Sequence, residues 1–181
     1  VLNGDCPLIT PQTLRELRSA RRGSPLAFVS CIVEEPGRLG RVLRDENGHP
    51  ERVVEAVDFE GPDGPAEINA GQYIFSAPWL WMTLSQVPLS TKGEYYLTHL
   101  IGTAAASHSP AATATADPDE ALGVDDRVKL AEAEAVMRRR ILETHMLNGV
   151  TIQDPATTWI DASVAIGADT TVLPNTHILG N

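Results

Sequence analysis

The chain has 181 residues, 43% of them hydrophobic, and a formal net charge of −10 at pH 7. The hydrophobic content suffices for a buried core and argues against wholesale disorder, while the acidic balance argues against nucleic acid or an anionic membrane as the main partner. Without a membrane-length apolar run or a signal-peptide pattern, the sequence predicts a soluble, cytoplasmic protein.

Two residue types limit the metal and redox chemistry that we expect. Cys6 and Cys31 each lie in an apolar, strand-like context, so we expect buried, unpaired thiols rather than a disulfide. The five histidines are scattered along the chain and lack the close pairing that is typical of a zinc site.

The beginning of the chain predicts an α/β unit. Residues 1–2 have the character of a strand end, and Asp5 lies in the turn after it. Thr10 is expected to cap a helix that stops near Gly23, and residues 25–33 predict a buried strand. A strand, a helix and a strand in this order indicate a parallel βαβ unit. Ligands bind beyond the carboxyl ends of such strands, which is where we expect Asp5.

The middle of the chain predicts further strands. Residues 41–43 and 52–55 flank an Asn-Gly dipeptide at 47–48, which is a strong hairpin signal. Residues 66–75 (AEINAGQYIF) predict another strand with a glycine, Gly71, inside it. A glycine within a strand often marks the close approach of a ligand or of another backbone.

The next segments are less regular. Residues 93–106 predict a turn followed by a helix, and residues 107–120 predict a loop with one weak edge strand at 112–116. We expect the neighbouring aromatic residues Trp79, Trp81, Tyr95 and Tyr96 to be packing residues rather than stacking platforms.

Residues 126–147 predict the clearest helix, because apolar residues recur there at spacings of three and four. After it the period changes to six, with Ile160, Ile166, Val172 and Ile178 at equivalent positions. A hexapeptide repeat is the mark of a β-helix. Several stacked units are needed to bury such a core, so we expect the chain to be cut at both ends, mid-sheet and mid-coil.

Several motifs occur together in a specific order. They are "LNGDCPLI", "GRLGRVLRDENG", "EINAGQYIF", "GEYYLTH", "GVDDRVKLAEAEAVMRRRI" and "GVTIQDPATTWID", followed by the hexapeptides. Over nearly its whole length the chain closely resembles the bacterial bifunctional N-acetylglucosamine-1-phosphate uridylyltransferase/glucosamine-1-phosphate acetyltransferase family.

The resemblance implies two activities for the complete protein. One domain transfers a uridylyl group from UTP to N-acetylglucosamine 1-phosphate with Mg²⁺, giving UDP-N-acetylglucosamine. A left-handed β-helix forms a homotrimer and acetylates glucosamine 1-phosphate from acetyl-CoA. The implied fold is a partial Rossmann-like α/β nucleotidyltransferase domain over 1–121, a linker helix over 122–149, and the first left-handed β-helix coils over 150–181.

The resemblance also assigns the catalytic residues. Asp5 and Asp125 would both hold Mg²⁺, which prefers oxygen ligands and neutralises the charge of the reacting phosphates. Asn3 and Gly4 join them as substrate-binding residues. Asp125 stands where the family has asparagine, and it could equally cap the long helix, a role compatible with metal binding.

The implied sugar-binding residues are Gly40, Glu55, Asn69, Tyr96 and Thr98, with Gly40 presenting backbone and Glu55 accepting from sugar hydroxyls. Four residues depart from the family pattern around this pocket: Arg38, Leu39, Val57 and His99.

The family's phosphate-binding loop would precede "LNGD", and its acetyltransferase residues would lie in later coils. We therefore expect this chain to be inactive by itself. The alternatives are another sugar-1-phosphate nucleotidyltransferase with a β-helix tail, or a non-catalytic assembly or regulatory relative.

Overall fold

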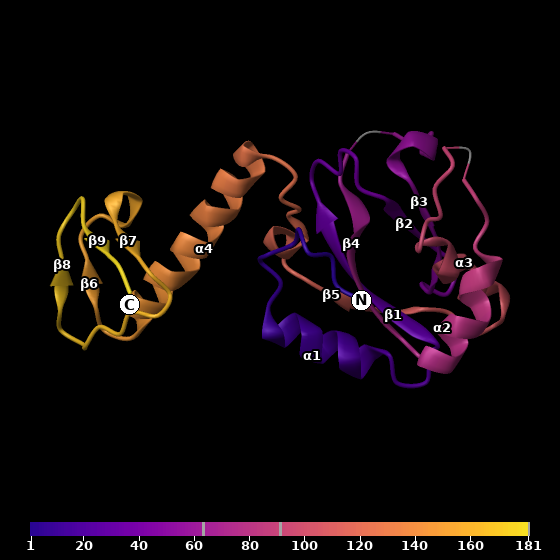
Figure 1. Cartoon of the computed structure of the whole chain (residues 1–181), viewed down its shortest axis with the longest axis horizontal. Coiled ribbons are helices and arrows are strands. Elements are labelled where there is room, and N and C mark those ends of the chain that lie inside the picture. Colours follow the sequence, from indigo (N-terminus) through magenta and orange to yellow (C-terminus); the bar gives the residue numbers. More distant parts are fainter. Residues whose placement is uncertain (63, 91, 181) are drawn as a thin grey trace. The chain divides into compact units, whose positions relative to one another are not determined.

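The computed structural model describes residues 1–62, 64–90 and 92–180, and it divides into two compact units (Figure 1). The first unit comprises Val1–Gly123, and the second begins at Val124. The α/β class that the sequence predicts is confirmed in the first unit.

The first unit contains a mixed five-stranded sheet with the order β3-β2-β4-β1-β5. Its strands are β1 (Leu26–Val33), β2 (Arg41–Arg44), β3 (Pro50–Val54), β4 (Ala66–Phe75) and β5 (Ala112–Thr115). Strand β1 pairs antiparallel with β4 and parallel with β5, and β2 pairs antiparallel with both β3 and β4. The predicted hairpin, the strand over 66–75 and the edge strand near 112–116 are therefore confirmed.

In the described residues of the first unit, three α-helices and three short 3₁₀ turns accompany this sheet. They are α1 (Pro11–Ala20), α2 (Ala77–Thr83), α3 (His99–Ala106), η1 (Ala56–Asp58), η2 (Leu84–Gln86) and η3 (Pro118–Ala121). The predicted cap of α1 is confirmed, because the Thr10 side chain accepts a hydrogen bond from the Thr13 backbone N–H. The short helix α2 was not predicted, since its seven residues are too few to show a helical period.

The alternation of side chains along β1 divides the core of the first unit into two clusters. Ala27, Val29 and Cys31 join Leu17 of α1 in one cluster. Leu26 and Phe28 join Leu100 and Ile101 of α3 in the other. Both faces of β1 are covered from Leu26 to Cys31, and this stretch is apolar apart from Ser30. Cys6 and Cys31 are buried free thiols, as expected.

The first residues correct the predicted βαβ unit. Residues 1–2 form no strand adjacent to β1, and Val1 instead pairs with Tyr73 of β4. The Val1 amino group donates to the Tyr73 carbonyl at 2.8 Å, and the Tyr73 N–H donates to the Val1 carbonyl at 2.9 Å. Such reciprocal bonds indicate an antiparallel pair. The chain at Val1 therefore runs parallel to β1, but Val1 and β1 are not neighbours, because β4 lies between them.

Two of the aromatic residues also differ from prediction. Trp81 and Tyr95 are 71% and 70% exposed, so neither is a packing residue. Trp79 does pack against the cluster around Leu100, as expected. Trp79 and Trp81 lie two positions apart in the short apolar helix α2, so they point to different sides of it. The sequence alone did not show that one of these sides is exposed.

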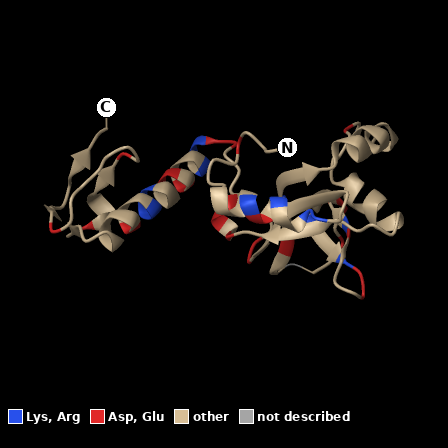
Figure 2. Cartoon of the chain, turned by 90° about the horizontal axis from the view of Figure 1, so that it is seen from below, with Lys and Arg blue, Asp and Glu red and all other residues tan. Residues whose placement is uncertain are grey.

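The second unit begins with α4 (Arg127–Leu147), which confirms the long predicted helix. Its cap is Asp126, whose carboxylate accepts from the Lys129 backbone N–H at 2.8 Å. The alternative that Asp125 caps this helix is therefore wrong. Figure 2 shows acidic and basic residues interspersed along α4. No described helix is long and apolar enough to cross a membrane.

Beyond α4 the chain forms two short parallel pairs. Strand β6 (Thr151–Ile152) pairs with β8 (Thr171–Val172), and β7 (Trp159–Ile160) pairs with β9 (His177–Ile178), with η4 (Pro155–Thr157) between β6 and β7. The four hexapeptide positions all contribute to one apolar cluster with Leu142 of α4. The six-residue period therefore marks side chains that share a core.

Candidate functional site

One face of β4 carries a row of polar groups. Asn69, Gly71 and Tyr73 are two positions apart, so they share a face of the strand. Gly71 has a φ of +86°, and a Cβ at this residue would collide with the side-chain amide of Asn3. The glycine thus allows Asn3 to lie between Asn69 and Tyr73. The group that approaches this glycine is therefore a side chain, rather than the ligand or backbone that the sequence predicted.

Hydrogen bonds fix the Asn69 side chain within this row. Its Oδ1 accepts from the Gly71 backbone N–H at 3.2 Å, and its Nδ2 donates to the Tyr73 hydroxyl at 2.7 Å. Burial raises the pKa of Tyr73; the Asn69 hydrogen bond opposes this rise, and the charge of Glu55 adds to it. The Tyr73 hydroxyl therefore stays protonated at neutral pH.

Three other predicted sugar-binding residues lie beside Asn69. The Asn69 backbone N–H donates to the Gly40 carbonyl at 2.9 Å. A Cβ built on Gly40 would lie 3.4 Å from Glu55 Oε2 and 2.7 Å from Val53 Cγ1, so only glycine fits there. The Thr98 hydroxyl donates to Glu55 Oε1 at 2.8 Å. The fold thus brings Gly40, Glu55, Asn69 and Thr98 together.

Tyr96 lies two residues before Thr98 in the sequence and is half-buried. Burial and then Glu94 raise the pKa of Tyr96, and the more distant charge of Glu55 adds to the rise. Among the departures from the family pattern, Arg38, Leu39 and Val57 are exposed, the last at 61%. They lie in the loop before β2 and in η1, on either side of Gly40 and Glu55 in the sequence.

The turn that carries Asp5 belongs to the first unit, and Asn3, Gly4 and Asp5 are all exposed. A Cβ built on Gly123 would lie 3.4 Å from Asp5 Oδ2, so the residue before Val124 approaches this carboxylate. Asp125 belongs to the second unit, and its pairing with Asp5 stays a prediction.

The Asp5 carboxylate suits Mg²⁺ as a ligand. Among the described residues, its one side-chain hydrogen bond is a weak one from Cys6 Sγ to Oδ1 at 3.9 Å, and Asp5 is exposed, so its oxygens are accessible. Within residues 1–62, 64–90 and 92–180, no group of three or more His, Cys, Asp or Glu side chains is arranged to hold a metal ion. Mg²⁺ commonly takes one or two protein carboxylates and completes its shell with water and substrate phosphates.

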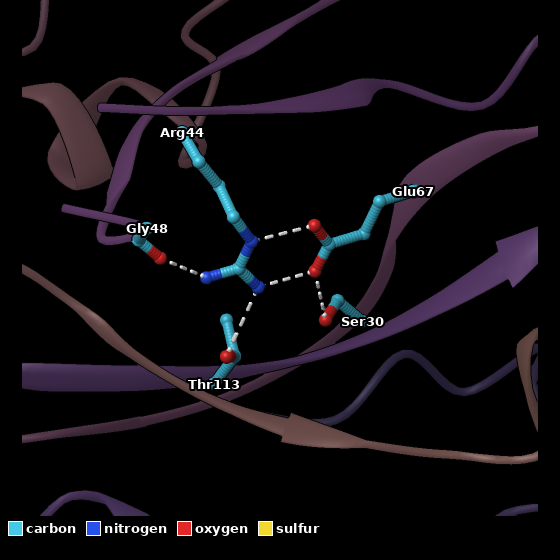
Figure 3. A network of polar contacts seen from close by, with 5 residues as sticks. All are labelled: Ser30, Arg44, Gly48, Glu67 and Thr113. Carbon is cyan, nitrogen blue, oxygen red and sulfur yellow. Dashed lines mark hydrogen bonds and ion pairs between the residues drawn. The ribbon is translucent and has the colours of Figure 1, made fainter. Parts of the chain in front are cut away.

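A polar network crosses the sheet on the face that carries Asn69 (Figure 3). Arg44 of β2 donates to Glu67 of β4 through Nε at 2.7 Å and Nη2 at 2.5 Å. Glu67 also accepts from the Ser30 hydroxyl of β1 at 2.6 Å, and Arg44 reaches Thr113 of β5 and the Gly48 carbonyl. The network therefore links four neighbouring strands two residues from Asn69.

A separate cavity of about 780 Å³ lies between the β2–β3 hairpin and α3. Its lining includes three histidines, His49, His99 and His108, together with Thr98. His99, one of the departures from the family pattern, therefore faces this cavity. Thr98 is the one predicted sugar-binding residue in its lining.

Comparison with known proteins identifies the relatives of this chain. No family model matches it. Over 99% of its length, it is 41% identical to the bifunctional protein GlmU of Caldanaerobacter subterraneus and 44% identical to that of Geobacter sulfurreducens. It is 45% identical over 94% of its length to the GlmU of Lactococcus lactis. The chain is a homologue of the bifunctional GlmU proteins. It spans about two fifths of their length, between 38% and 40% for these three.

A solved structure supports the fold. The chain is similar to CMP:2-keto-3-deoxy-manno-octonic acid synthetase complexed with CTP, with a TM-score of 0.52 and 18% identity. The match covers 77% of this chain and 61% of the other. At this identity the likeness concerns the fold alone, and it agrees with the mixed sheet of the GlmU homologue described here.

The sequence motifs did not identify Tyr73 and Glu67 as residues of the site. Both follow the two-residue period of β4 on either side of Asn69 and Gly71. That period was a usable signal, since residues on one strand face share one environment. The interstrand partners Arg44 and Ser30 left no such signal, because they come from other strands.

Proposed function

We propose that the first unit binds the sugar-phosphate part of UDP-N-acetylglucosamine and of N-acetylglucosamine 1-phosphate. The observation that carries this proposal is the convergence of Gly40, Glu55, Asn69 and Thr98 on one side of β4. These residues come from four separate segments, and homology to GlmU over nearly the whole chain supports the same reading. Glu55 can accept from sugar hydroxyls, and Asn69 offers an amide that can both donate and accept.

In the whole protein, the reaction proposed for this site is uridylyl transfer from UTP to N-acetylglucosamine 1-phosphate. Two anionic groups must meet in this reaction, so positioning and charge neutralisation provide most of the catalysis. Asp5, with Asp125 as the second proposed ligand, would hold Mg²⁺, which supplies the charge neutralisation when bound. The Asn3 side chain lies beside Gly71 of β4, two residues before Asp5 in the sequence, and we propose that it helps to orient the substrate.

For the second unit we propose the first coil of a left-handed β-helix. The support is the parallel pairing of β6 with β8 and of β7 with β9, together with the hexapeptide positions in one core. By the same homology, we propose that the whole protein is a cytoplasmic homotrimer that also acetylates glucosamine 1-phosphate from acetyl-CoA.

Ligand titration tests the sugar site directly. UDP-N-acetylglucosamine added with Mg²⁺ to the ¹⁵N-labelled chain should shift the amide resonances of residues 66–75. Glu55→Gln should weaken binding by about tenfold, the usual effect of losing one hydrogen bond to a charged acceptor. Glu51→Gln, an equivalent change at an exposed residue of β3, should leave binding unaltered. If the ligand leaves β4 unshifted, or if both variants behave alike, the proposed site is wrong.

The metal assignment needs the whole protein. Asp5→Ala should abolish uridylyl transfer and leave acetyl transfer intact, because Asp5 lies in the first unit and the proposed acetyltransferase belongs to the β-helix. Pyrophosphate release and coenzyme A release measure the two reactions separately. Undiminished uridylyl transfer by this variant would remove Asp5 from the mechanism.

A further inference from the structure

The hydrogen bonds around Asn69 have a defined direction. The Gly71 backbone N–H can only donate, so the Asn69 atom that faces it is the carbonyl oxygen Oδ1. The atom that faces the Tyr73 hydroxyl is therefore the amide nitrogen, which donates to it at 2.7 Å. The hydroxyl oxygen of Tyr73 thus acts as an acceptor, and its own proton remains available. Within the part of the chain that the structure describes, no acceptor for that proton is seen.

The ring of Tyr73 is rigidly held. The residue is 5% exposed, and its ring stacks on Phe75 with centroids 5.6 Å apart and lies 6.2 Å from the Phe28 ring. The backbone N–H and the backbone carbonyl of Tyr73 are both hydrogen-bonded to Val1. A donor fixed in this way loses little conformational entropy when it binds a ligand.

Tyr73 complements the other groups of the sugar site. An ionised Glu55 has only acceptors, and one of its oxygens already accepts from Thr98. It can therefore recognise sugar hydroxyls but cannot donate to a carbonyl oxygen. The Tyr73 hydroxyl, which is hydrogen-bonded to the Asn69 amide at 2.7 Å, adds a donor that Glu55 lacks.

We infer that Tyr73 is a specificity-determining residue for the sugar: its hydroxyl orients the Asn69 amide and donates its proton to the carbonyl oxygen of an N-acyl substituent. This inference rests on the proposed function. A ligand without the N-acyl carbonyl would leave the Tyr73 hydroxyl without an acceptor, and an unpaired buried donor lowers the affinity for that ligand. A sugar with a hydroxyl in place of the acylamino group would therefore bind more weakly.

The test compares two ligands, UDP-N-acetylglucosamine and UDP-glucose, by calorimetric titration of the chain with Mg²⁺. The variant is Tyr73→Phe, which keeps the ring and removes only the hydroxyl. The matched control is Tyr95→Phe, the same change at a residue that is 70% exposed. Circular dichroism and the thermal midpoint establish that each variant is folded.

We expect Tyr73→Phe to weaken UDP-N-acetylglucosamine binding about tenfold and UDP-glucose binding less than twofold, so that discrimination between them is lost. Tyr95→Phe should change neither affinity. An equal loss for both ligands, or no loss for either, would overturn the inference while the proposed function stands. If the unaltered chain binds neither ligand, the proposed function fails and the inference fails with it.

Discussion

Replacing Arg44 with alanine should show how strongly the polar network of Figure 3 holds the sheet beside the site. Arg44 contacts Glu67 with two nitrogens, and the two side chains are 31% and 21% exposed. Hydrogen bonds to charged groups contribute ~1.5–3 kcal/mol to stability, whereas fully exposed ion pairs contribute ~0.2–1 kcal/mol. Because the Arg44–Glu67 pair is half-buried, its contribution should lie within the range that these values span. We expect Arg44→Ala to lower the free energy of unfolding of the first unit by about 2 kcal/mol.

A double-mutant cycle with Glu67→Gln isolates the interaction itself. We expect a coupling free energy of about 1 kcal/mol between the two residues. Urea unfolding in a Trp159→Phe background measures it, because the remaining tryptophans, Trp79 and Trp81, both lie in the first unit. Arg52→Ala is the matched control, since Arg52 is exposed on the neighbouring strand β3. A coupling below about 0.3 kcal/mol, within the additivity expected for independent sites, would refute the reasoning.

The same pair predicts a pH dependence. Burial raises the pKa of Glu67, but the hydrogen bonds from Arg44 and Ser30 outweigh burial, and the net pKa lies below its ordinary value of 4.5. Because the pKa of Glu67 is lower in the folded state than in the unfolded state, the ionised carboxylate stabilises the fold fully at any pH above the unfolded-state pKa. This stabilisation is lost as the pH falls through the folded-state pKa. The stability difference between the unaltered chain and Glu67→Gln should therefore shrink below about pH 4.5.

Two further substitutions test the close approach on β4 and the core of the second unit. Gly71→Ala should lower the free energy of unfolding by about 1 kcal/mol, the strain of a Cβ at φ +86°, because the exposed Asn3 side chain can move away from the new methyl group. Gly48→Ala, at φ +81° with open space around it, should cost about the same; a loss at Gly71 that is larger by more than about 1 kcal/mol in urea unfolding would show that Asn3 cannot move aside. Leu142 is 2% exposed, and Leu142→Ala should lower the free energy of unfolding of the second unit by about 2–4 kcal/mol. Leu147 is 80% exposed, and Leu147→Ala should change this free energy by less than about 0.5 kcal/mol. Thermal unfolding measures both. A small effect at Leu142 would mean that the hexapeptide core does not depend on α4.

Local patterns in the sequence determined much of the fold. The cap at Thr10, the Asn-Gly turn at 47–48 and the glycine within 66–75 each act through the conformational preferences of a few neighbouring residues. The six-residue period likewise predicted a shared core in the second unit, because equivalent positions of a repeat meet the same surroundings. The ordered motifs also indicated the GlmU relatives that the comparison then found.

Tertiary structure decided which distant residues meet. Thr98 and Glu55 are 43 positions apart and share a hydrogen bond, and Val1 pairs with a residue 72 positions away on β4 rather than lying beside β1. No local period encodes such pairs, since they depend on the order of strands in the sheet. The role proposed for Tyr73 depends on the same kind of meeting: the two-residue period places Tyr73 on the face of Asn69, but only the folded chain brings its hydroxyl within 2.7 Å of the Asn69 amide.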